Sequence, residues 1–140
     1  ANDPAIYLYE GDLLISKDKP GDAAGRYEQA IHFDPACKEA YIKYANVYQG
    51  VTPTLSIEML QKVISNYPDY LPAYCHLGNI YSLQGNYPKA VAAYKTYMAG
   101  GLYSTDNLVH YASALFFNKQ YAESGKIISE GQAIEHDNFL

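Results

Sequence analysis

The feature that most constrains the fold is a fixed spacing of large and small residues in the stretch YCHLGNIYSLQGNYPKAVAAYKTYM, residues 74–98. Residues three and four positions apart lie on one face of a helix. Gly85 interrupts the pattern, and glycine commonly ends a helix. The stretch therefore predicts two helices joined by a short turn. Six of its residues define the spacing: Tyr74, Leu77, Gly78, Tyr81, Ala90 and Tyr94.

The same spacing recurs along the chain with a period of about 34 residues, which indicates a repeat architecture. A small residue occupies the same place in each predicted first helix: Gly11, Ala45, Gly78 and Ala112. The first unit departs from the pattern at Glu10, where a large apolar residue is usual. We expect one domain over residues 1–140, with repeats at about 4–37, 38–70, 71–104 and 105–138. The predicted helices cover about 4–17, 21–33, 37–49, 54–66, 71–84, 87–99, 105–117 and 121–134.

This pattern resembles the tetratricopeptide repeat family, whose signature is aromatic-x2-Leu-Gly-x2-Tyr followed by Ala-x3-aromatic. The resemblance extends over nearly the whole chain and is most specific in residues 71–104. It implies an all-α fold, an α-α superhelix or solenoid of about four helical hairpins. In such a fold each hairpin leaves an apolar face that the next hairpin buries.

The resemblance also implies a binding surface, because in this family the first helices line a concave groove that commonly holds a peptide or a partner helix. Asn46 and Asn79 are at equivalent groove positions, where their amides would either bond a peptide backbone or remain solvated. Carrying the groove positions across one by one gives the predicted binding residues: Asp12, Ile42, Asn46, Gln49, Cys75, Asn79, Ser82, Val109, Ser113 and Phe116.

Composition argues against several classes of partner. The formal net charge is −5, with 10 Lys and Arg against 15 Asp and Glu, so we expect no nucleic-acid binding, which needs a basic surface. No apolar run approaches the roughly 20 residues of a membrane span, so we expect no membrane insertion. The 16 tyrosines beside a single arginine favour a bacterial source. Cytoplasm and periplasm both remain open as the compartment.

The sequence contains no recognised catalytic motif. The residues that come closest to a reactive or metal-binding group are Cys75, His76 and His110, since the two histidines are one repeat apart. Such residues on adjacent helices either hold a metal or are ordinary polar surface residues. We predict no catalytic residue, no metal site and no cofactor.

The expected function is therefore a non-enzymatic scaffold that binds a protein or peptide in the groove. The alternative is a structural segment that positions a neighbouring domain of a larger multidomain protein. A third interpretation, an enzyme with its site across the groove, is a different class. The last residues, AIEHDNFL, are similar to AIHFDPAC at the end of the first unit. We therefore expect Phe139 and Leu140 to begin a further repeat or cap, and the chain to be part of a longer protein. We also expect it to self-associate through its terminal repeats.

Overall fold

The computed structural model describes residues 3–101 and 104–138, and in these residues every regular element is a helix. Seven helices begin and end within one residue of the predicted bounds, whereas the last continues four residues further. Phe139 and Leu140, expected to begin another repeat, lie outside the described residues. The helices are α1 (Pro4–Ser16), α2 (Pro20–Phe33), α3 (Lys38–Tyr48), α4 (Pro53–Asn66), α5 (Pro72–Leu83), α6 (Tyr87–Met98), α7 (Thr105–Phe117) and α8 (Tyr121–Asn138).

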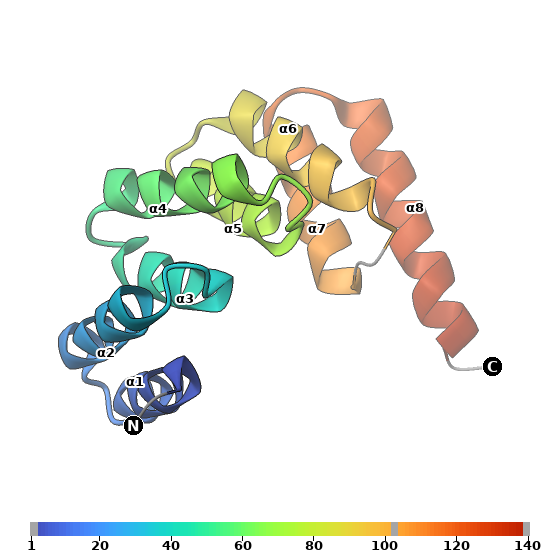
Figure 1. The fold of residues 1–140 in the computed structure, drawn as a ribbon. Coiled ribbons are helices and arrows are strands. Elements are labelled where there is room, and N and C mark those ends of the chain that lie inside the picture. Colours follow the sequence, from blue (N-terminus) through green and yellow to red (C-terminus); the bar gives the residue numbers. More distant parts are fainter. Residues whose placement is uncertain (1–2, 102–103, 139–140) are drawn as a thin grey trace. The chain divides into compact units, whose positions relative to one another are not determined.

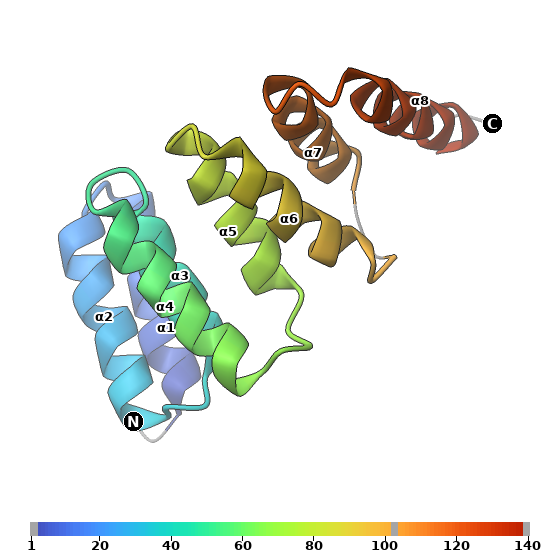
Figure 2. The same ribbon diagram turned by 90° about the horizontal axis from the view of Figure 1, so that it is seen from above.

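The helices form two compact units, Ala1–Asp69 and Tyr70–Leu140. In each unit, consecutive helices pair as antiparallel hairpins: α1 with α2 and α3 with α4 in the first, α5 with α6 and α7 with α8 in the second (Figures 1 and 2). The third helix of each unit packs on the hairpin before it, α3 on α2 and α7 on α6 and α5. The core of each unit therefore lies between one hairpin and the next.

Local sequence explains where the helices begin. Proline stands in the first turn of α1, α2, α4, α5 and α6, where its missing N–H costs no hydrogen bond. The Asp3 side chain accepts a hydrogen bond from the Ala5 N–H at 2.9 Å and caps α1. Ser104 caps α7 and exchanges hydrogen bonds with Asn107. After α5, Gly85 has a φ of 72°, which supplies the tight turn into α6.

The two helices of the first and third hairpins touch through a glycine and a tyrosine ring. Gly78 is buried, and a Cβ added there would lie 2.6 Å from Cε1 of Tyr94. Gly11 faces the ring of Tyr27 in the same way. Each tyrosine is almost completely buried. The ring therefore occupies the space that any larger residue in the first helix would need.

The second and fourth hairpins use a different contact. Their small residues are Ala45 and Ala112, and the helix opposite each carries a buried serine. The Ser56 hydroxyl donates to the carbonyl oxygen of Ala45 at 2.6 Å, and the Ser124 hydroxyl donates to that of Ala112 at 2.8 Å. A carbonyl oxygen has a second lone pair beyond the one used in its own helix, so these hydrogen bonds join the two helices without disrupting either.

The buried tyrosines keep partners for their hydroxyl groups. Tyr94 Oη donates to Asn79 Oδ1 at 2.5 Å, and Tyr27 Oη donates to Asp12 Oδ1 at 2.8 Å. Burial raises the pKa of Tyr94 from 10.0 to about 12, because the phenolate would lose its hydration. The pKa of Tyr27 is raised by burial and also by the Asp12 carboxylate. Both side chains are therefore neutral packing residues at physiological pH.

We expect Gly78→Ala to lower the free energy of unfolding by about 1–3 kcal/mol, because the new methyl group overlaps the Tyr94 ring. The matched control is Gly125→Ala in α8, where nothing lies within 4 Å of the added Cβ. That change should be neutral or stabilise the helix by up to about 1 kcal/mol. Urea unfolding followed by circular dichroism measures both. Equal effects of the two substitutions would refute the close-contact interpretation.

Stability should fall between pH 10 and about 12, the interval between the ordinary pKa of tyrosine and that of buried Tyr94. Over this interval the unfolded chain loses the phenolic proton while the folded chain keeps it, which favours unfolding. Tyr94→Phe should make this decline shallower, and should cost about 1 kcal/mol at pH 7 through the lost hydrogen bond. Tyr121→Phe, at a side chain that is 58% exposed, is the control and should leave the slope unchanged. Unfolding curves from pH 7 to 12 test this, and an unchanged slope in Tyr94→Phe contradicts it.

Candidate functional site

The predicted binding residues come from the first helix of each hairpin. In the first unit these are Asp12 on α1, Ile42 and Asn46 on α3, and Gln49 directly after α3. In the second unit Cys75, Asn79 and Ser82 lie on α5, and Val109, Ser113 and Phe116 lie on α7. The structure brings Asp12 and Asn46 together in the first unit, and Val109, Ser113 and Phe116 together in the second. A single groove that includes all ten residues stays a prediction.

The first unit contains a cavity of about 340 Å³ between α1 and α3. Two of the predicted binding residues line it, and both are polar: Asp12 and Asn46. Of the other predicted residues in this unit, Ile42 is buried, with 7% of its surface exposed, and Gln49 is half-buried. We call this cavity the α1–α3 pocket, and its lining residues are Asp12, Ile15, Tyr27, Lys43, Asn46 and Val47.

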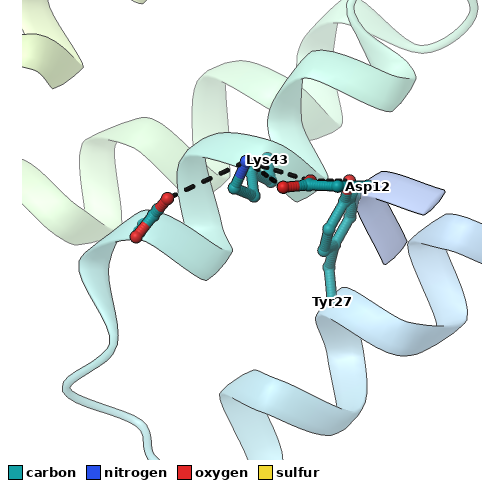
Figure 3. Close-up of polar contacts among 4 residues, drawn as sticks. Asp12, Tyr27 and Lys43 are labelled. Carbon is teal, nitrogen blue, oxygen red and sulfur yellow. Dashed lines mark hydrogen bonds and ion pairs between the residues drawn. The ribbon is translucent and has the colours of Figure 1, made fainter. Parts of the chain in front are cut away.

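One wall of the α1–α3 pocket is an ion pair that joins the two helices (Figure 3). Lys43 Nζ lies 3.0 Å from each carboxylate oxygen of Asp12, which also accepts the hydrogen bond from Tyr27. Glu39 Oε1 lies 3.8 Å from the same Lys43 nitrogen. The charges of Asp12 and Lys43 therefore largely satisfy each other. The pair is half-exposed, so we expect it to orient the two side chains more than it stabilises the fold.

Lys43 was missed by the prediction from sequence, which considered only the groove positions carried over from the family. The sequence feature that could have identified Lys43 is the opposite charge of Asp12, which lies at a facing position on the first helix of the preceding hairpin. Asn46, by contrast, is exposed, and its side chain makes no hydrogen bond to any residue that the structure describes. Its amide is therefore available as both a donor and an acceptor.

The three predicted residues on α5 take part in packing within the second unit. Asn79 accepts the hydrogen bond from Tyr94, and the Ser82 hydroxyl is buried. Cys75 Sγ accepts a hydrogen bond from Asn107 Nδ2 at 3.4 Å, and burial raises the pKa of this thiol. A thiol with a raised pKa is a poor nucleophile, because the thiolate is the reactive form.

The second unit contains a cavity of about 500 Å³ between α7 and α8. Three of the predicted residues, Val109, Ser113 and Phe116, are exposed on it. Val109 and Phe116 are 58% and 53% exposed, which is high for such large apolar side chains. We call this cavity the α7–α8 pocket, and its lining residues are Val109, Ala112, Ser113, Phe116, Phe117, Ser124 and Ile128.

The described histidine and cysteine residues of the second unit do not form a metal site. Burial lowers the pKa of His76, so this imidazole is neutral at physiological pH. Among residues 3–101 and 104–138, no three His, Cys, Asp or Glu side chains are close enough together to hold a metal ion. None of the helices in the same ranges has the length and the apolar character that a membrane span requires.

Comparison with known proteins supports the fold and one repeat directly. Residues 59–92 match the family model described as tetratricopeptide repeat. No curated protein matches the sequence significantly. A crystal structure of MamA is similar with a TM-score of 0.82 and 21% identity, over 98% of this chain and 81% of that one.

Two further solved structures share the fold. A structure of PilF from Pseudomonas aeruginosa matches with a TM-score of 0.85 and 16% identity, over 95% of this chain and 61% of PilF. TTC0263, described as a thermophilic TPR protein in Thermus thermophilus, matches with a TM-score of 0.78 and 14% identity, over 95% of this chain and 75% of that one. The resemblance seen in the sequence is thus confirmed: residues 59–92 match the tetratricopeptide repeat family, and the described helices have the all-α fold of proteins built from such repeats.

Proposed function

We propose that this chain is a non-enzymatic scaffold that binds an extended peptide segment of a partner protein along its first helices. The tetratricopeptide fold is consistent with a protein-interaction scaffold. The observation that supports a peptide site is the α1–α3 pocket, whose apolar side chains lie beside an unengaged amide. Binding pockets commonly combine an apolar lining with a few polar groups that fix the orientation of the ligand.

The residues of the α1–α3 pocket indicate which kind of peptide would fit. Ile15, Tyr27 and Val47 offer an apolar surface for one apolar side chain of the peptide. The Asn46 amide matches the alternating N–H and C=O groups of an extended backbone. Lys43 is already paired with Asp12 and lies near Glu39, so an acidic peptide residue would meet two carboxylates at this place. We therefore expect a preference for neutral or basic segments over acidic ones.

A second candidate is a structural segment that positions a neighbouring part of a larger protein. The observation that favours it is the exposed apolar surface of α7 and α8, which a further element would bury. In this case the pockets on the first helices need not bind a peptide. The non-enzymatic part of the proposal is supported by Cys75, which is half-buried and hydrogen-bonded to Asn107; its raised pKa makes this thiol a poor nucleophile.

The test is a selection of peptides from a random displayed library on the purified chain, followed by affinity measurements with the selected peptides. Asn46→Ala should weaken binding about fivefold, the value of one hydrogen bond of about 1 kcal/mol. It should leave the melting temperature unchanged, since this amide has no partner in the described structure. Asn46 is replaced alone because Asn79 holds the Tyr94 hydroxyl.

The matched control is Gln61→Ala, which removes an exposed amide from the second helix of the same hairpin. It should leave peptide affinity unchanged. If no peptide is selected, or if Gln61→Ala weakens binding as much as Asn46→Ala, the proposed site is wrong. Selection of mainly acidic peptides would contradict the expected preference.

A further inference from the structure

Two interior contacts show how one hairpin of this chain is covered by the next helix. In the first unit, Tyr44 of α3 packs into a cluster with Ala23, Ala24 and Tyr27 of α2, and Leu8 of α1 lies against it. In the second unit, Tyr111 of α7 lies over Tyr94 of α6, with ring centroids 6.1 Å apart. As a result, Tyr27 and Tyr94 are only 2% and 1% exposed.

The last hairpin carries the same receiving surface, but no described residue covers it. By repeat position, Val109 corresponds to Leu8, and Ile128 corresponds to Tyr27 and Tyr94. Ile128 is nevertheless 49% exposed and lines the α7–α8 pocket. A smaller cavity of about 100 Å³ continues along the same seam beside Val109 and Ile128. We call Val109, Phe116 and Ile128 the tail face.

The helix α1 carries the opposite surface, which likewise no residue of the described ranges covers. On α3, Tyr44 and Val47 belong to the cluster that packs on α2. The buried Ala40 lies four residues before Tyr44 and so on the same helical face. The corresponding residues of α1 are Ile6, Glu10 and Leu13, which we call the head face. Ala40 is completely buried, whereas Ile6 and Leu13 are 41% and 42% exposed.

We propose that a second copy of this chain places its head face on the tail face of the first, so that copies join head to tail. The chain presents both halves of a contact that it already makes twice inside itself, α3 on α1–α2 and α7 on α5–α6. The two faces are different surfaces, so the contact is heterologous and each copy can engage a partner at either end. This self-association uses neither Asn46 nor Lys43, and it is independent of the proposed peptide site.

Glu10 makes this contact weaker than the interior ones. It stands where α3 and α7 insert Tyr44 and Tyr111, and a carboxylate is disfavoured against an apolar surface. In the described structure Glu10 instead pairs with Arg26 of its own hairpin at 3.2 Å. Association should therefore be reversible and concentration-dependent. Replacing Glu10 by tyrosine restores the residue that the interior contacts use.

Sedimentation equilibrium from micromolar to millimolar protein tests the proposal. The average mass of the unaltered chain should rise above the 15.6 kDa of one copy as concentration increases. Leu13→Glu blocks the head face and Ile128→Glu blocks the tail face, so each variant alone should remain monomeric. An equimolar mixture of the two should form dimers only, because one head and one tail stay intact. Glu10→Tyr should tighten association about tenfold.

The matched control is Leu83→Glu, which places the same charge at a 69% exposed leucine of α5 outside both faces. It should associate like the unaltered chain. Circular dichroism checks that each variant folds. If Leu13→Glu does not fold, Ile6→Glu replaces it on the head face, and if Ile128→Glu does not fold, Val109→Glu replaces it on the tail face. A strict monomer even for Glu10→Tyr overturns the proposal. Association that persists in Ile128→Glu or in Leu13→Glu also overturns it; persistence in Leu13→Glu would indicate a tail-to-tail dimer. Loss of association in Leu83→Glu overturns it as well.

Discussion

The fold depends on how closely the two helices of each hairpin approach one another. The approach is decided where a small residue of the first helix meets the second helix. Two solutions alternate along the chain: Gly11 and Gly78 face the rings of Tyr27 and Tyr94, whereas the carbonyl oxygens of Ala45 and Ala112 accept a hydrogen bond from a buried serine of the second helix. An aromatic ring fits only where no Cβ is present, which explains why glycine and tyrosine occur together.

Which of these two contacts a hairpin uses also determines which polar side chains of its first helix remain free to hydrogen-bond a ligand. A buried tyrosine needs a partner for its hydroxyl, and Tyr27 and Tyr94 find theirs in Asp12 and Asn79 on the first helices. In the second hairpin the corresponding buried residue of α4 is Leu60, which has no hydroxyl and needs no such partner. Asn46 therefore stays unengaged although it is equivalent to Asn79. Residues at the same repeat position thus have different roles because the helix behind them differs.

The same repeat logic explains why Ile128 differs from Tyr27 and Tyr94 in exposure. An interior hairpin has its apolar face covered by the next first helix, and Tyr27 and Tyr94 are buried for this reason. Ile128 has the same position and half of its surface exposed. Because this position is isoleucine in the fourth repeat, there is also no hydroxyl that would need a hydrogen-bond partner. Apolar surface at such a place is a natural site for another copy or another protein.

The sequence alone determined the number of helices, nearly all of their bounds and their pairing into hairpins. These follow from local spacing, from prolines in first turns and from glycines in turns, which act over a few residues of chain. Only the tertiary structure decided which polar side chains of the first helices already have a hydrogen-bond or ion-pair partner within the chain. That outcome depends on contacts between residues far apart in sequence, such as Lys43 with Asp12 and Tyr94 with Asn79. Repeat position brings such residues near each other, but the hydrogen bonds formed depend on the identity of every neighbour, so no repeat pattern specifies them.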